Sequence, residues 1–135
     1  MFDGCARCFT CIYADVNGLH AVNNKYGHAV GDEMLRTVAR IMGDALGWER
    51  GYRVGGDEYV FFVAEASQEE IDRRLAAARA EIRSNNYHVA LGVETMDKKE
   101  SNAIGLIRHA EANMYEDKRA YYEKAENNRR GVRRV

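Results

Sequence analysis

Residues 52–63, YRVGGDEYVFFV, constrain the fold more than any other stretch of this chain of 135 residues. Two apolar runs flank Gly55 and Gly56, and paired glycines in such a setting predict a tight hairpin, because glycine accepts the positive φ angles that tight turns need. Asp57 and Glu58 follow the glycines directly. Two carboxylates at a hairpin tip repel each other unless a hard cation neutralises them. The alternative interpretation is a solvated acidic turn.

A second segment, residues 12–35, IYADVNGLHAVNNKYGHAVGDEML, strengthens the case for a ligand site. It begins as a strand that ends at Asp15 and turns through Gly18 into a short helical run. Two more glycines precede Asp32, which is placed to open an amphipathic helix. Asp15 on its own would also fit a helix N-cap before Gly18.

The two segments together resemble the GGDEF family of diguanylate cyclases. In that family the signature D-x-D-x-F-K-x-x-N-D-x-x-G-H-x-x-G-D-x-x-L precedes G-G-[DE]-E-F. The matching positions here are Asp15, Asn23, Gly27, His28, Gly31, Asp32 and Leu35, then Gly55, Gly56, Asp57 and Glu58, with Tyr59 in the Phe position. Residues 106–118, LIRHAEANMYEDK, resemble the late helix of the family, L-x-x-A-D-x-A-M-Y-x-A-K.

The order of the elements predicts an α/β fold, an α+β sandwich with helices over a mostly antiparallel sheet. Ser67 with Glu70 forms a capping box at the start of one helix. The strands expected are 9–14, 50–54, 59–64 and 89–95, and the longer helices expected are 33–46, 68–83 and 102–124. This pattern agrees with the ferredoxin-like palm that the resemblance implies, as in nucleotide cyclases.

The composition, 46% hydrophobic and 30% charged residues, fits one globular domain over residues 1–135. We expect the polar and basic segment 125–135, AENNRRGVRRV, to be a flexible tail. Members of the family usually carry a helix with an L-T-G-L-x-N-R-R stretch before the first strand, but only eight residues precede Phe9. We therefore expect a truncated domain, with a sensory or dimerisation module upstream in a longer protein.

The net charge of -1 argues against general nucleic-acid binding, which usually needs a basic surface. No apolar run approaches the roughly twenty residues that a membrane span needs, and no signal-peptide pattern is present. We expect a cytoplasmic location without membrane contact.

Three cysteines, Cys5, Cys8 and Cys11, form a C-x-x-C-x-x-C pattern that is also found in metal and cluster sites. No fourth ligand is evident nearby. Cys11 falls in the predicted first strand, where inert packing is the better interpretation.

The resemblance implies that two GTP molecules are joined into cyclic di-GMP, with release of pyrophosphate. It implies two Mg²⁺ or Mn²⁺ ions per active site and a homodimer, because each subunit carries half of the site. The metal ligands implied are Asp15, the backbone of Val16, Asp57 and Glu58, and Asp15, Asp57 and Glu58 are also the catalytic residues. Phosphoryl transfer needs such carboxylates because divalent ions stabilise the attacking and the leaving oxygen.

Substrate contacts are also implied by the resemblance. The amides of Gly18 and Leu19, between strand and helix, would bind phosphates, and Gly55 and Gly56 would lie against the substrate. Lys118 takes the position of the family's phosphate-binding lysine; otherwise it would be an ordinary exposed helix lysine. Asn23 and Asp32 would recognise guanine, since Asp accepts from N1 and N2 while Asn donates to O6 or N3. Without the resemblance, Asn23 is a turn residue and Asp32 a helix N-cap.

Several positions depart from the family pattern. Asn17 replaces the second Asp, His20 replaces the Lys, and Tyr122 stands where many members have a phosphate-binding Arg. Residues 46–49, LGWE, replace the Arg-x-x-Asp of the product-inhibition site. The alternative function is therefore a weak or inactive GGDEF domain that binds GTP or regulates, and a more distant one is a redox or metal module built on the cysteines.

Overall fold

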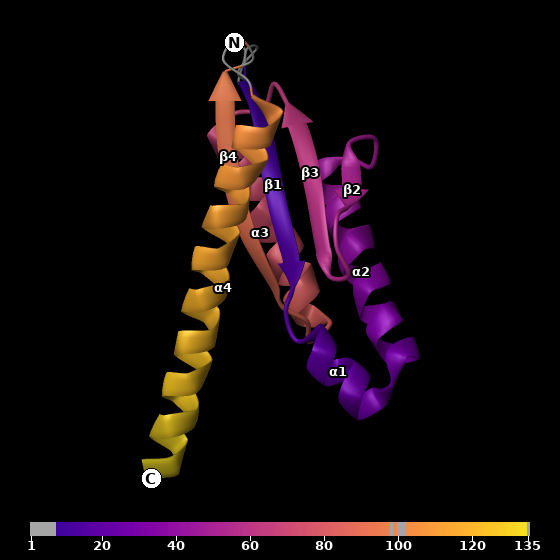
Figure 1. Ribbon diagram of the computed structural model, residues 1–135, viewed down its shortest axis with the longest axis vertical. Coiled ribbons are helices and arrows are strands. Elements are labelled where there is room, and N and C mark those ends of the chain that lie inside the picture. Colours follow the sequence, from indigo (N-terminus) through magenta and orange to yellow (C-terminus); the bar gives the residue numbers. More distant parts are fainter. Residues whose placement is uncertain (1–7, 98, 100–101, 135) are drawn as a thin grey trace.

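A four-stranded antiparallel sheet in the order β2-β3-β1-β4 organises the chain, with β1 paired along both of its edges. The computed structural model describes residues 8–97, 99 and 102–134. The elements are β1 (Cys8–Val16), α1 (Leu19–Tyr26), α2 (His28–Leu46), β2 (Gly51–Arg53), β3 (Glu58–Ala64), α3 (Gln68–Ser84), β4 (Val89–Asp97) and α4 (Ala103–Arg134). Figure 1 shows this order, which confirms the predicted α+β architecture.

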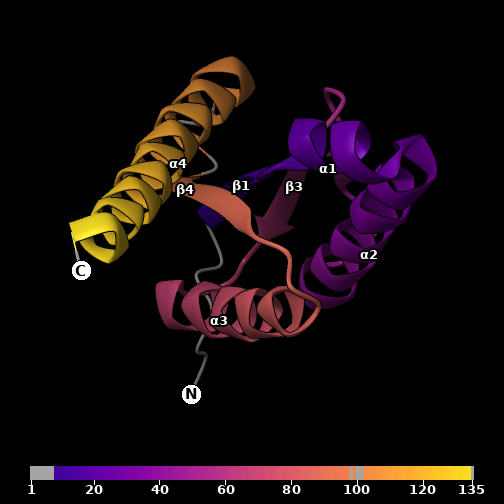
Figure 2. The ribbon, with the colours of Figure 1, turned by 90° about the horizontal axis from the view of Figure 1, so that it is seen from below.

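Side chains along β1 alternate between the two faces of the sheet, as the period of two in a strand requires. Ile12, Ala14 and Val16 pack into the core under α2 and α3, whereas Cys11 and Tyr13 pack under α4. Figure 2 shows α2 and α3 on one side of the sheet and α4 on the other. The large apolar core therefore lies on one face, and a smaller one lies beneath α4.

Cys11 is fully buried beneath α4, and burial raises the pKa of its thiol to about 12. A buried thiol that stays protonated is inert, which confirms the packing role predicted for Cys11. Cys5, which begins the C-x-x-C-x-x-C pattern, lies outside the described residues.

Helix α4 approaches β4 very closely at Gly92. A Cβ at this position would lie 1.9 Å from the carbonyl oxygen of Ala110 and 2.2 Å from the amide nitrogen of Met114. Both atoms belong to the helix backbone, so no side-chain movement could make room. Only glycine lets the helix sit this low on the sheet.

Polar contacts fix the register of α4 along β4. The Asp117 carboxylate accepts from the Leu91 backbone N–H and from the Arg79 guanidinium, both at 2.9 Å. The Asn113 side-chain amide donates to the Val93 carbonyl at 2.8 Å. These contacts determine the positions along β4 at which the polar side chains of α4 meet the sheet.

The helix that carries Asp32 begins earlier than predicted. α2 starts at His28, so Asp32 is an exposed residue inside the helix, and the prediction that it opens the helix is wrong. Gly27 makes the break between α1 and α2, with φ 92° and its N–H bonded to the Asn23 carbonyl at 2.9 Å. Because glycine takes this conformation without a steric penalty, the chain turns at Gly27 rather than at Asp32.

Strands β2 and β3 pair as predicted, but residues 54–57 connect them and neither Gly55 nor Gly56 has a positive φ. The prediction of a positive-φ glycine turn is wrong. Instead, a Cβ at Gly55 would lie 2.8 Å from Oε1 of Glu58. The Arg53 guanidinium donates to the carbonyls of Gly55 at 3.2 Å and Gly56 at 2.5 Å. Gly55 leaves room for Glu58, and Arg53 stiffens the connection.

The start of α3 and the end of α4 were also predicted from the sequence. The hydroxyl oxygen of Ser67 accepts from the Glu70 N–H at 3.2 Å, which confirms the predicted cap of α3. α4 continues to Arg134, so its predicted end at residue 124 is wrong; segment 125–134 contains no proline and is rich in good helix formers. In Figure 1 this part of α4 runs past the end of the sheet.

In the described parts of the chain, no helix combines the length and apolarity needed to cross a bilayer.

We predict that Gly92→Ala lowers the free energy of unfolding by about 3 kcal/mol or more, because the methyl group must lift the α4 backbone off β4. Urea denaturation followed by circular dichroism measures the change. Gly105→Ala is the matched control, since a Cβ there would make only ordinary contacts with Asn102, at 3.6 Å and beyond. Equal stability of the two variants would contradict this account of the α4 contact.

Candidate active site at the end of the first strand

Asp15 and Glu58 lie opposite each other on the two central strands. Directly opposed side chains in an antiparallel pair have Cβ atoms roughly 5 Å apart. The carbonyl of Asp57 accepts from the Val16 N–H at 2.9 Å, which fastens the β2–β3 connection to the end of β1. The structure therefore brings Asp15, Val16, Asp57 and Glu58 together at one corner of the sheet, as the sequence predicted.

One face of α4 lies over this corner. Glu111, Tyr115 and Lys118 follow the i, i+4, i+7 spacing that places residues on one side of a helix. The Lys118 ammonium lies 3.3 Å from Oδ2 of Asp15. The Tyr13 hydroxyl donates to Oε2 of Glu111 at 3.3 Å. The acidic corner of Asp15, Asp57 and Glu58 thus has a cationic neighbour in Lys118 and a further carboxylate in Glu111.

Asp15 is held in an unfavourable environment for a carboxylate. It is 3% exposed, and its Oδ1 is buried without a hydrogen-bond partner in the described part of the chain. Burial and the charge of Asp57 raise the pKa of Asp15, and Lys118 offsets only part of this. Because a buried carboxylate oxygen without a partner is costly, the corner favours the arrival of a cation or a hydrogen-bond donor.

The environment of Glu58 also disfavours the ionised form of its carboxyl. Burial raises the pKa of its carboxyl, and the charges of Asp15, Asp57 and Glu111 raise it further. The Tyr13 hydroxyl acts in the opposite direction, because a hydrogen bond to the ionised form stabilises it. Among the described residues, the four carboxylates of Asp15, Asp57, Glu58 and Glu111 therefore share a corner with one lysine, Lys118.

Tyr13, Glu111 and Tyr115 were missed by the sequence analysis as members of this corner. Burial is the main cause that raises the pKa of Tyr13, whereas the charge of Glu111 is the main cause for Tyr115. A signal for the two helix residues exists in the sequence. Glu111 and Tyr115 stand at the acidic and the Tyr positions of the late-helix motif, spaced with Lys118 on one helix face.

The turn after β1 leaves backbone amides free at the start of α1. Gly18 takes a left-handed conformation, φ 83° and ψ 9°, and no side chain caps the helix. The N-cap role considered for Asp15 is therefore wrong. The first helical bond runs from the Val22 N–H to the Gly18 carbonyl at 3.0 Å, so the amide of Leu19 has no partner within the helix.

Asn17 has a structural role in this chain. It is 6% exposed, and its Nδ2 lies 2.5 Å from Nδ1 of His88. Burial lowers the pKa of His88, which favours the neutral ring that can accept from Asn17. The His88 ring stacks on Tyr121 with centroids 3.7 Å apart, and Tyr122 meets Tyr121 edge-on. These contacts join the end of β1 to β4 and α4.

Among the described residues, the side chains of Asn23 and Asp32 make no hydrogen bond to the acidic corner. Asn23 is partly buried where α1 meets α2, and its Oδ1 is buried without a partner. Asp32 is exposed on α2, one residue after Gly31. Among the described residues, no hydrogen bond joins the two side chains to each other or to Asp15.

The donors at the corner fit a hard divalent cation. No three Asp, Glu, His or Cys side chains in the described part of the chain converge into a complete metal cage. Mg²⁺ does not require one, because it commonly binds one or two carboxylates together with substrate phosphates and water. The unpartnered Oδ1 of Asp15 and the clustered carboxylates supply that type of donor.

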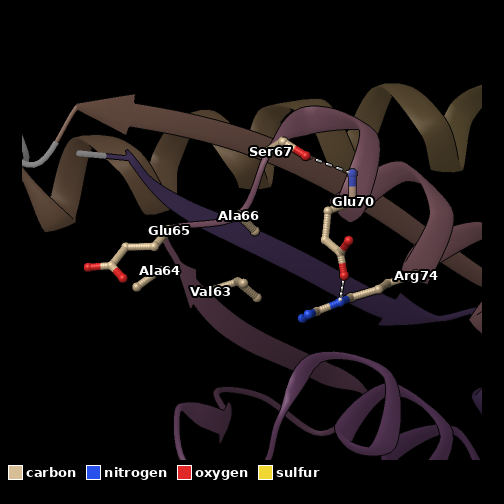
Figure 3. Close-up of a pocket in the computed structure, with 7 residues that line it drawn as sticks. All are labelled: Val63, Ala64, Glu65, Ala66, Ser67, Glu70 and Arg74. Carbon is tan, nitrogen blue, oxygen red and sulfur yellow. Dashed lines mark hydrogen bonds and ion pairs between the residues drawn. The ribbon is translucent and has the colours of Figure 1, made fainter. Parts of the chain in front are cut away.

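Two hollows of the described surface are lined by other residues. A small hollow of about 180 Å³ sits at the β3–α3 junction, at the far end of β3 from Glu58 (Figure 3). Its Glu70 and Arg74 side chains bond to each other at 2.9 Å, and Ser67 caps α3, so its polar groups already have partners. A larger groove of about 680 Å³ beside α1 is lined by Asn17 but by none of the predicted site residues.

Comparison with known sequences gives consistent matches. The family described as Diguanylate cyclase, GGDEF domain, matches residues 4–124. The cyclic di-GMP phosphodiesterase PdeR of Escherichia coli (strain K12) is 29% identical over 113 residues, covering 77% of this chain and 17% of that protein. Diguanylate cyclase DgcZ of the same strain is 38% identical over 60 residues, covering 44% of this chain and 20% of that protein. The chain spans a fifth or less of these relatives, whose names carry opposite activities.

Solved structures share the fold. The active GGEEF domain of a diguanylate cyclase from Vibrio cholerae gives a TM-score of 0.72 at 21% identity, covering 84% of this chain and 78% of that one. The GGDEF domain of DgcB from Caulobacter crescentus, in complex with c-di-GMP, gives 0.74 at 24% identity, covering 84% and 74%. These likenesses confirm the predicted fold class.

We predict that Glu58→Gln stabilises the metal-free protein at pH 7, by on the order of 0.5–1 kcal/mol. The pKa of Glu58 is raised in the folded state, so ionisation costs stability as the pH rises from the ordinary value of about 4.3 through the folded value. The amide removes that loss and keeps an oxygen that can accept from Tyr13.

Urea denaturation in chelator at pH 4 and pH 7 measures the effect. The gain should shrink as the pH falls to 4, where the carboxyl is largely neutral in both states. Glu123→Gln, on an exposed part of α4, is the control. A Glu58→Gln variant that is less stable than its parent at pH 7 would contradict the proposed repulsion.

Proposed function

The chain belongs to the GGDEF domain family, and we propose that it is a diguanylate cyclase domain that condenses two GTP molecules into cyclic di-GMP with release of pyrophosphate. The observation that carries this proposal is the buried Asp15 opposite Glu58, with an unpartnered carboxylate oxygen at a family motif position. In the reaction, the 3′-hydroxyl of one GTP attacks the α-phosphorus of the other. Catalysis then consists of positioning and charge neutralisation.

We assign Asp15, Asp57, Glu58 and the backbone of Val16 to hold two Mg²⁺ or Mn²⁺ ions per site. When bound, the ions stabilise the charge on the attacking and leaving oxygens. Repulsion among the carboxylates supports this assignment, since it makes cation binding favourable. Glu58, with its raised pKa, is also suited to accept the proton of the attacking hydroxyl.

The triphosphate would bind between α1 and α4. The amides of Gly18 and Leu19 supply donors at an uncapped helix start, where the helix dipole also favours an anion. Lys118 is partly exposed and lies 3.3 Å from Asp15, so it can turn from that carboxylate to a phosphate. Gly55 and Gly56 would lie along the substrate at the tip of the hairpin.

Guanine would be recognised by Asn23 and Asp32. The Asp32 carboxylate is exposed and accepts from N1–H and N2–H, while the Asn23 amide donates to O6. Adenine presents an amino group in place of O6, which leaves these polar groups unpaired.

Turnover would need a homodimer, because one site supplies one GTP and the reaction joins two. A cytoplasmic location, where GTP is available, is part of the proposal. An upstream module would then set the distance between the two subunits.

A second candidate function is a GTP-binding regulatory domain without turnover. Tyr122, in the place of a phosphate-binding Arg, is 46% exposed and packs on Tyr121. It offers no positive charge to a γ-phosphate. One matching relative, PdeR, is named for the opposite reaction.

We predict that the chain, at high protein concentration with Mg²⁺ or Mn²⁺, converts GTP into cyclic di-GMP and pyrophosphate. Asp57→Ala should lower product formation by on the order of 100-fold or more, because a carboxylate at the reacting centre is lost. Liquid chromatography with mass spectrometry identifies the product, and Glu123→Gln is the control.

Product formation by Asp57→Ala equal to that of the parent would contradict the assigned site. If the parent binds GTP but yields no product even when two copies are covalently linked, the regulatory function is the correct one.

A further inference from the structure

Gly31 lies directly against the side chain of Asn23. A Cβ at Gly31 would lie 1.8 Å from Oδ1 and 2.9 Å from Cγ of Asn23. The next atom is Cδ1 of Leu19, at 3.1 Å. The Asn23 amide therefore occupies the volume that any side chain at Gly31 would need.

The contact is different in kind from the one at Gly92. At Gly92 the obstructing atoms belong to a helix backbone, whereas at Gly31 the nearest atoms are the far end of a side chain that can rotate. A methyl group at Gly31 would displace the amide without separating α1 from α2. Alanine is also the better helix former by about 1 kcal/mol, so such a variant should fold.

The contact also orients the amide. Oδ1 is buried against Gly31 and has no partner among the described residues, whereas the Asn23 side chain as a whole is only partly buried. An amide held in this way presents N–H donors to a ligand. Guanine O6 can accept from such a donor, whereas the adenine amino group at the same position cannot.

We propose that Gly31 is a positioning residue that determines base specificity. Because Gly31 has no Cβ, the Asn23 amide can pack against it with its N–H groups directed outward. This orientation selects guanine over adenine. This inference rests on the guanine subsite of the proposed function. It assigns Gly31 no contact with the nucleotide. Its effect is transmitted through Asn23 alone.

The test compares GDP with ADP, which carry the two bases but lack the pyrophosphate leaving group, by isothermal titration calorimetry. The parent should bind GDP more tightly than ADP. Gly31→Ala should reduce the ratio of the two affinities by at least about 10-fold, through weaker GDP binding at unchanged ADP affinity. The thermal midpoint of unfolding should not fall.

Two further variants separate specificity from structure. In an Asn23→Ala background, Gly31→Ala should change the ratio no further, because no amide remains to be displaced. Gly105→Ala, at a glycine of α4 where a Cβ would make only ordinary contacts with Asn102, should leave the ratio unchanged.

Equal loss of GDP and ADP affinity in Gly31→Ala, or an unchanged ratio, would overturn the inference while leaving the guanine subsite intact. A parent that binds GDP and ADP equally would instead refute the guanine subsite itself, and the inference with it.

Discussion

The buried carboxylate of Asp15 is the constraint on which the rest of the structure depends. β1 pairs with β4 along its whole length and with β3 over residues 9–15, so Asp15 is carried to the edge of the core and held opposite Glu58. Lys118 lies 3.3 Å away but does not neutralise the group, because burial and Asp57 still raise the pKa of Asp15. The fold therefore places mutually repelling carboxylates at one corner, where a divalent cation would relieve the repulsion.

The position of α4 makes this arrangement possible. Gly92 lets the helix backbone rest on β4, and Asp117 fixes its register through the Leu91 amide. Glu111, within the Gly92 contact, then meets Tyr13, and Lys118, about one helical turn beyond Met114, meets Asp15. Packing and chemistry are thus linked, since a shift of α4 would move Lys118, the lysine that contacts Asp15.

The sequence predicted the strands and the presence of the longer helices, because alternation and apolar periodicity are local signals, and the family resemblance implied that Asp15 meets Asp57 and Glu58. It failed at two glycines, one that acts through space and one that acts through its own φ. Gly55 makes room for Glu58, and Gly27 rather than Asp32 starts α2. Tyr13 could not be placed at the site from its position in an apolar strand, because its partner Glu111 lies far along the chain.

The most direct test is Mn²⁺ binding, followed by electron paramagnetic resonance in the presence of GDP. The account predicts that the parent binds Mn²⁺ and that Asp15→Asn weakens binding by at least about 10-fold, because the buried carboxylate is the central ligand. Glu123→Gln should bind as the parent does. Equal Mn²⁺ affinity of Asp15→Asn and the parent would contradict the claim that this corner is built for a cation.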